Sequence, residues 1–137
     1  MSACWFGGAV GSYRAWQSAI RSGTPHDAHA CGQLGAAYAA MSVAGQVLHD
    51  AAHAIDAGES TRALQRRALW TRHVVETSCL TVVECMGRAP GDGALTFDFA
   101  QARRIADLPV YLRQGRADRD LASLGEMVSS APEMAWI

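Results

Sequence analysis

The chain has 137 residues, a formal net charge of −1 and a hydrophobic fraction of 50%. This length suits one domain, and the apolar fraction is high enough to bury a core, which excludes an intrinsically disordered chain. With 12 basic and 13 acidic residues, the chain has no basic excess for binding nucleic acid or anionic lipid, and we expect neither partner.

A first helix is predicted before residue 22. Its apolar residues recur at spacings of three and four, which places them on one face of a helix. Ser22 and Gly23 are expected to end it. The predicted buried face consists of Phe6, Ala9, Tyr13, Trp16 and Ile20.

A second helix is expected to begin at the segment Thr24-Pro25-His26-Asp27, which offers an N-cap, a proline at the first helical position and an acid in the first turn. Small residues along this helix, chiefly alanines and Gly45, would allow another helix to approach closely. The predicted buried stripe alternates steps of four and three, as in a helix packed lengthwise against its neighbours. It consists of Leu34, Tyr38, Met41, Gly45, Leu48, Ala52 and Ile55.

A third helix is predicted from about Thr61 to Gly87, after a short turn over residues 56–60. Residues 74–83 are rich in β-branched side chains, and a strand is the alternative there. We favour a helix because no turn residue interrupts the segment and because its apolar residues keep helical spacing. These residues make the helix apolar over most of its circumference, as expected of a central helix, and they include Val75, Cys79, Val82 and Met86.

The segment Arg88-Ala89-Pro90-Gly91-Asp92-Gly93 is a predicted loop, because it is dense in helix-breaking residues. A fourth helical stretch follows it. Pro109 is expected to kink or split this stretch, and Gly115 offers a second place to bend. The apolar residues of this stretch are Ile105, Leu108, Leu112, Leu121, Leu124 and Val128.

These elements predict an all-α fold, an antiparallel four-helix up-and-down bundle with short connections. Residues 1–128 form a single domain in this interpretation, and residues 129–137 form a C-terminal tail. Met134, Trp136 and Ile137 in the tail are apolar enough to dock on a neighbour.

The N-terminus lacks a basic segment followed by a long apolar run, and no apolar run approaches the roughly 20 residues of a membrane span. We therefore expect a cytoplasmic protein without membrane contact. The four cysteines, Cys4, Cys31, Cys79 and Cys85, contain no C-x-x-C pair, and buried free thiols are expected rather than disulfides.

Two histidines offer a candidate metal site. His49 and His53 are four residues apart on a predicted helix, a spacing that can place two imidazoles on one metal ion. His26, His29 and Cys31 add possible donors near the start of that helix. A metal site in a helical bundle usually needs carboxylates from facing helices as well, so we interpret His49 and His53 as boundary or surface residues and expect no metal.

The segment from Ala102 to Gly125 is rich in Arg and Asp. It can form a solvated face with local ion pairs such as Arg103 with Asp107, each worth a few tenths of a kcal/mol. Alternatively, its planar guanidinium groups can bind phosphate or carboxylate on a partner. Every basic residue of the chain is Arg, which excludes mechanisms that need a lysine nucleophile or base.

The same segment, together with Trp5-Phe6-Gly7-Gly8-Ala9 and Leu34-Gly35-Ala36-Ala37-Tyr38, resembles the C-terminal helical domain of flavin-dependent acyl-CoA dehydrogenases, especially actinobacterial-type members. The resemblance runs from about Trp5 to Val128. In that family the domain is a four-helix bundle that follows an N-terminal helical domain and a middle β domain. The resemblance implies that the chain forms the oligomer core of such an enzyme and covers part of the FAD bound by a neighbouring subunit.

The family's cofactor-contacting residues carry over only in part. Its Gln-x-x-Gly-Gly segment, which approaches the neighbour's flavin nucleotide, falls on residues 84–88, where Gly87 matches and Glu84 replaces the Gln. Arg103 and Arg104 fall near the family's Arg-Asp pair. The resemblance therefore implies a cofactor contact formed by Gly87, Arg88, Arg103 and Arg104.

No catalytic residue carries over. The Glu-Gly-Thr of many family members falls near Arg113-Gln114-Gly115, where no carboxylate is present. Arginine stays protonated at neutral pH and cannot abstract a proton from a substrate. Asp118 is the nearest acid, and no geometric argument assigns it that role.

Three functional hypotheses follow from the sequence. The first is a subunit or fragment that completes a flavin-dependent acyl-CoA dehydrogenase with a companion chain, binds FAD only in that complex, forms a homo-oligomer and is inactive alone. The second is a repurposed, cofactor-free helical bundle that acts in assembly or interaction. The third is a small metal-binding bundle that uses His49 and His53.

Overall fold

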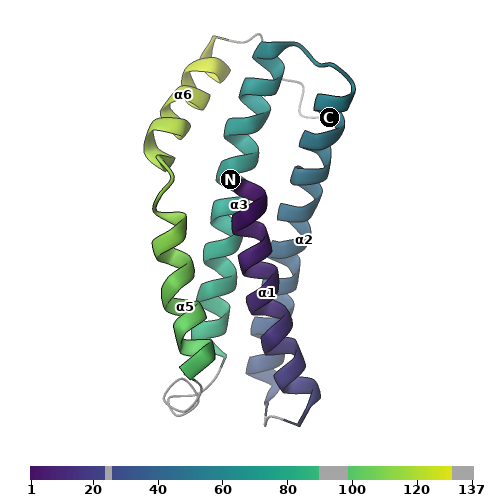
Figure 1. Ribbon diagram of the computed structural model, residues 1–137, viewed down its shortest axis with the longest axis vertical. Coiled ribbons are helices and arrows are strands. Elements are labelled where there is room, and N and C mark those ends of the chain that lie inside the picture. Colours follow the sequence, from purple (N-terminus) through teal and green to yellow (C-terminus); the bar gives the residue numbers. More distant parts are fainter. Residues whose placement is uncertain (24–25, 90–98, 131–137) are drawn as a thin grey trace.

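The computed structural model describes residues 1–23, 26–89 and 99–130 and is helical along nearly all of them (Figure 1). The helices pack side by side along the long axis, and consecutive helices reverse direction up to α5, after which α6 continues in the direction of α5. The prediction of an all-α fold is confirmed, since the described residues contain no strand. The helices are α1 (Ser2–Arg21), α2 (Ala28–Asp56), α3 (Thr61–Arg88), α5 (Phe99–Leu112) and α6 (Ala117–Ser129).

The first turns of α2 and α3 are each capped by a side chain. Asp27 caps α2 by accepting a hydrogen bond from the Ala30 backbone N–H at 2.8 Å, so α2 begins later than predicted and Asp27 is its N-cap rather than a first-turn acid. Ser60 caps α3 by accepting from the Ala63 N–H at 3.4 Å. The predicted N-cap at Thr24 and the proline at residue 25 lie outside the described residues.

The buried face of α1 is centred one residue away from the predicted one. Trp5 is fully buried, and Ala9, Ser12 and Trp16 continue its line. The larger predicted residues Phe6, Tyr13 and Ile20 are partly buried and pack against the core from the flank of the helix. The helix and the burial of Ala9 and Trp16 were therefore predicted correctly, but the buried Trp5 in the first turn was missed.

The predicted stripe of α2 is wrong at several positions. Tyr38 and Ile55 are 63% and 64% exposed, and Ala52 is exposed too. Alanines take their place because α2 packs closely along α3, where small side chains bring the two helix axes together. The residues buried on α2 are Ala30, Ala37, Met41, Ala44, Val47 and Ala54.

Ile55 is exposed because α1 covers only the lower part of α2. A Cβ atom on Gly45 would lie 3.4 Å from the ring of Phe6, so the first turns of α1 lie beside Gly45. Ile55 follows Gly45 by almost three helical turns and therefore extends past the start of α1. Figure 1 shows the same arrangement, with the N-terminus about half-way up the molecule.

The third helix occupies the centre of the molecule, as predicted. It contacts α1, α2, α5 and α6. Four of its residues, Val75, Cys79, Val82 and Met86, are at most 1% exposed. The alternative of a strand at residues 74–83 is wrong.

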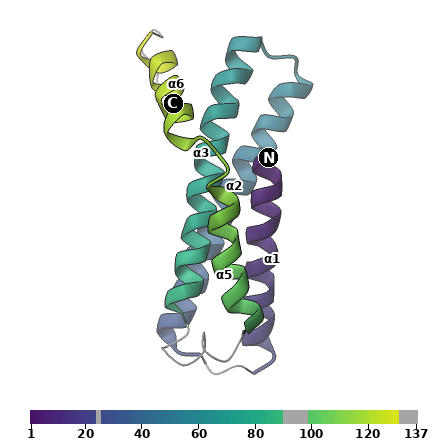
Figure 2. The ribbon, with the colours of Figure 1, turned by 60° about the vertical axis from the view of Figure 1, so that its left-hand side comes forward.

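The predicted fourth stretch is divided, but not at Pro109. The helix α5 continues through Pro109 to Leu112, and the break falls at residues 113–116, which include Gly115 (Figure 2). Leu108 and Leu112 are buried as expected. Leu121 and Val128, two further apolar residues of this stretch, are exposed.

The helix α6 has no buried residue and packs mainly on α3, which explains these two exposed side chains. Of the predicted loop at 88–93, only Arg88, in the last turn of α3, and Ala89 are described. Met134, Trp136 and Ile137 lie outside the described residues. No helix in the described part of the chain is both long and apolar enough to cross a bilayer.

Candidate functional site

The four residues predicted to contact a cofactor lie on two helices at one end of the molecule. Gly87 and Arg88 form the last turn of α3, and Arg103 and Arg104 lie in the first turns of α5. The helices α3 and α5 pack against each other, and the end of α3 and the start of α5 both lie at the lower end of the molecule as drawn in Figure 1. Among the described residues, no hydrogen bond joins the pair on α3 to the pair on α5.

Two of the three arginines in the predicted cofactor contact have an acidic partner. Arg88 pairs with Glu84 at 2.6 Å, and Arg103 pairs with Asp107 at 3.2 Å. Each pair links successive turns of one helix, and all four side chains are exposed, so each contributes only a few tenths of a kcal/mol. The local pairing of Arg103 with Asp107 was expected from the sequence and is confirmed.

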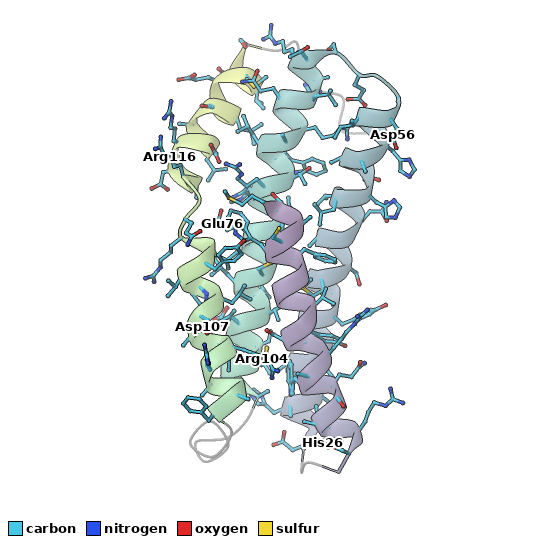
Figure 3. All side chains as sticks on the ribbon, in the orientation of Figure 1. His26, Asp56, Glu76, Arg104, Asp107 and Arg116 are labelled. Atoms are coloured by element: carbon cyan, nitrogen blue, oxygen red, sulfur yellow. The ribbon has the colours of Figure 1, made fainter. Side chains whose placement is uncertain are left out.

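Arg104 differs from both of these arginines. It is exposed and forms no ion pair or hydrogen bond with any described residue. Figure 3 labels Arg104 in the same half of the molecule as Asp107. The carboxylate of Asp107 is already paired with Arg103. No described residue therefore occupies the guanidinium of Arg104, a group that binds anionic groups such as phosphate and carboxylate.

Two further features of this end are the open space beside Gly87 and a hydrogen bond from α2 to the last turn of α3. A Cβ atom on Gly87 would meet no described atom within 4 Å, so no described side chain covers the backbone of α3 there. The His29 ring donates to the backbone carbonyl of Arg88 through Nε2 at 3.3 Å. This bond fixes the start of α2 against the end of α3 and thus holds the last turn of α3 in place.

The histidines do not form a complete metal site in the described part of the chain. The rings of His49 and His53 lie with their centroids 5.4 Å apart, and both side chains are exposed. No group of three or more His, Cys, Asp or Glu residues with metal-binding geometry occurs among the described residues. His26, His29 and Cys31 are exposed near the start of α2, away from His49 and His53.

The prediction that all four cysteines are buried is only half right. Cys79 and Cys85 are buried, whereas Cys4 and Cys31 are exposed, and all four are free. Burial, together with a smaller contribution from Glu76, raises the pKa of Cys79 to about 12, and burial also raises the pKa of Cys85. Both buried thiols therefore stay protonated near neutral pH and are poor nucleophiles.

A polar cluster between α3 and α6 was not found from the sequence. Arg72 on α3 pairs with Asp120 on α6, and Glu76 lies near both. Burial is the main cause of a raised pKa at Glu76; His73 and Arg72 oppose this shift, and Asp118 and Asp120 add to it. The pair joins residues far apart in the chain, and no local pattern indicates it. It fixes the position of α6 and contains no group arranged as a nucleophile.

No protein-family model, curated protein or solved structure matches this chain.

Proposed function

We propose that the chain is a helical module of a flavin-dependent acyl-CoA dehydrogenase, resembling the four-helix C-terminal domain of that family. In this proposal it completes the flavin site of a companion chain, contributes to the oligomer core and does not catalyse a reaction alone. The all-helical fold and the long, side-by-side packing of α1, α2, α3 and α5 support the proposal.

The observation that carries the proposal is the end formed by α3 and α5. It combines open space beside Gly87 with the guanidinium of Arg104, which no described residue pairs. A guanidinium binds phosphate oxygens through two parallel N–H donors, and the pyrophosphate of FAD presents such oxygens. The donor chemistry at this end therefore fits the nucleotide part of FAD.

The flavin, when bound, would supply the hydride acceptor, whereas this chain supplies binding and shielding. Arg104 is the residue expected to hold the anionic group directly. Arg88 and Arg103 are partly neutralised by Glu84 and Asp107 and would add positive potential around it. Gly87 leaves room for the approach.

The proposal is tested by reconstitution with a second dehydrogenase chain. That chain carries the N-terminal and middle domains but lacks its own C-terminal domain. We expect the two chains to co-purify with flavin absorbance and thioester-dependent flavin reduction. Loss of one charge-assisted hydrogen bond in Arg104→Gln should weaken FAD retention about tenfold. The matched control is Arg119→Gln on α6, an exposed arginine toward the opposite end of the molecule. If FAD is never retained in the complex, the proposal is wrong.

A cofactor-free assembly protein is the second candidate. The exposed, uncharged surface of α2 favours it, because such a surface suits packing against another helix and needs no cofactor. Light scattering distinguishes the two candidates. An oligomer that forms fully in the absence of flavin and binds no companion dehydrogenase supports the second and contradicts the first.

A further inference from the structure

The last two turns of α2 carry a pair of exposed histidines. His49 and His53 are four residues apart on the helix, so their side chains are neighbours on its surface. Their ring centroids are 5.4 Å apart, and the ring planes are tilted by 34°. No described residue forms a hydrogen bond with either ring. The two imidazoles therefore lie side by side with no polar partner among the described residues.

The separation of the two rings matches that of two ligands of one tetrahedral metal ion. Zinc binds an imidazole nitrogen at about 2.0–2.1 Å, which places the centre of the ring about 3.2 Å from the metal. At a tetrahedral angle, two such ring centroids are about 5.2 Å apart, close to the observed 5.4 Å. Ligands at right angles, as in square-planar copper sites, would need a separation of about 4.5 Å. The ring positions therefore fit Zn²⁺.

Both rings can direct a nitrogen at one ion without a change in the helix. The terminal torsion of a His side chain is broad, and rotation about it turns the ring nitrogens while the ring centre stays nearly in place. Because His49 and His53 are both exposed, no packing contact opposes this rotation. The spacing of the ring centres, which the helix fixes, is thus the condition that matters.

The charges around the pair favour a cation. Asp50 and Asp56 lie three residues before and three residues after His53, so both are its neighbours on the helix surface. Neither forms an ion pair with a described residue, and α2 contains no Lys or Arg. The carbonyl end of a helix also carries partial negative charge, and His53 lies in the last turn of α2.

The other histidines on described elements are less suited to bind a metal ion. Nε2 of His29 is hydrogen-bonded to the backbone carbonyl of Arg88, at 3.3 Å. His73 on α3 is exposed but has no second histidine within two helical turns. His49 and His53 are thus the pair whose spacing and surroundings both suit a cation.

We propose that His49 and His53 bind one Zn²⁺ ion on the surface of α2, each through one ring nitrogen, with water in the other two positions. The described residues offer no third ligand, so this site has fewer protein ligands than a structural or a catalytic zinc site. Zinc therefore binds it reversibly, and the chain folds without the ion. This proposal departs from the interpretation of the sequence, in which no metal was expected.

The ion would join two successive turns of α2 where the fold is least supported. Of the described residues of α2 beyond Val47, Ala54 alone is buried, since α1 starts half-way along the molecule. Local opening costs least in such a region, and a ligand that binds the folded form opposes opening. Zinc should therefore suppress fraying at the end of α2.

The zinc site lies away from the end formed by α3 and α5. Figure 3 labels Asp56 toward the upper end of the molecule and Arg104 in its lower half. The inference goes beyond the proposed function and does not depend on it, because it requires neither flavin nor a companion chain.

Calorimetric titration of the untagged chain with zinc chloride tests the site. The exposed Cys4 and Cys31 are first replaced by Ser, because free thiols bind zinc themselves. One Zn²⁺ ion per chain is expected. His49→Gln and His53→Gln should each weaken binding by about tenfold or more, because even the loss of a group that only orients a metal ligand costs that much.

Two controls are matched in residue type. His73→Gln removes an exposed imidazole outside the pair and should leave zinc binding unchanged. The double variant His53→Gln, Ser42→His keeps the number of histidines but sets two of them seven residues apart, about 10.5 Å along the helix. One ion cannot bridge that distance, so this variant should bind zinc as weakly as His53→Gln alone.

Amide hydrogen exchange in the presence and absence of zinc locates the ion by a second measurement. Zinc should slow exchange at residues 49–56 of the Cys4→Ser, Cys31→Ser chain, because the ion holds the last two turns of α2 together. The same amides should not respond to zinc when His53→Gln is added. Slowed exchange at the start of α2 instead would place the ion elsewhere and overturn the proposal.

Three results of the titration overturn the proposal: no zinc binding at millimolar concentration, binding that neither His49→Gln nor His53→Gln weakens, and undiminished binding by the His53→Gln, Ser42→His chain. Flavin retention with a companion dehydrogenase is measured separately, without zinc. A chain that retains FAD in that complex but binds no zinc therefore contradicts this inference and supports the proposed function.

Discussion

At the scale of single residues, Trp5 and Gly115 determine how α5 and α6 are joined. Trp5 is completely buried, and its indole N–H has no hydrogen-bond acceptor among the described residues. A Cβ atom on Gly115 would lie 2.9 Å from Cη2 of this ring, which is closer than real Cβ contacts allow. Gly115 is thus required by a close approach to a rigid aromatic ring.

Gly115→Ala is expected to lower the free energy of unfolding by about 1–3 kcal/mol, since the buried ring has little space to move. Urea denaturation followed by circular dichroism measures the change. Gly125→Ala is the control, because its Cβ meets nothing within 4 Å and should gain up to about 1 kcal/mol from helix propensity. Equal stability of the Gly115→Ala chain and the native chain would show that the ring moves freely.

The importance of Trp5 could not be predicted from the sequence around it. Helical spacing places it beside Phe6 and Ala9 on α1, but its cover comes in part from Gly115 near the other end of the chain. The pairing of Arg72 with Asp120 was missed for the same reason. Local pairs such as Arg103 with Asp107 were predictable because both residues lie on successive turns of one helix.

At the scale of elements, α6 is the least buried helix. It has no buried residue. It is held on α3 by the packing of its partly buried side chains and by polar contacts. Arg72 pairs with Asp120, and Arg62 donates to Ser130 at 3.2 Å. Glu76 lies in the same region, where burial raises its pKa and the nearby Asp120 and Asp118 raise it further.

Glu76→Gln is expected to make the chain more stable at pH 7. A carboxyl pKa that is higher in the folded state means that folding disfavours the ionised form, so stability falls as pH rises through the unfolded pKa of about 4.3 and then the raised folded pKa. The gain should shrink as pH falls below about 4, where Glu76 is protonated in both states. Urea denaturation at several pH values measures this dependence.

The matched control for this experiment is Glu126→Gln at an exposed position of α6. Its stability difference from the native chain should be small at every pH measured. A Glu76→Gln chain that is less stable at pH 7 would show that attraction to Arg72 and His73 outweighs the cost of burial.

Helices were more predictable than the faces they bury. The third helix was expected from about Thr61 to Gly87 and spans Thr61–Arg88, because a long uninterrupted periodic segment is a strong local signal. The face of α2 was misplaced because Tyr38 and Ile55 dominate a hydrophobic pattern, whereas the close packing on α3 selects alanines. Pro109 was overestimated as a breaker, and Gly115 marks the actual break.

At the scale of the whole molecule, burial is concentrated toward one end. The buried residues of α3 lie from Thr71 onward, and on α2 Ala54 alone is buried beyond Val47. The start of α1 half-way along the molecule explains this distribution (Figure 1). The all-α class was predictable from periodicity, but the relative positions of the helices depend on contacts that no single segment encodes.

Amide hydrogen exchange is expected to show this gradient. Amides at residues 50–56 and 61–69 should exchange faster than those at 37–47 and 75–86, because local opening costs less where few side chains are buried. Uniform protection along α2 and α3 would contradict the gradient.

Of the two short connections, the one at 57–60 is expected to tolerate a break in the backbone, whereas the one at 113–116 is not. Gly58 turns the chain at a φ of 68° with open space around it, so relocating the termini there in a circular permutant leaves the core intact. Opening the backbone at Gly115 instead would release the segment that closes over the Trp5 indole, and such a permutant should lose its cooperative melting transition.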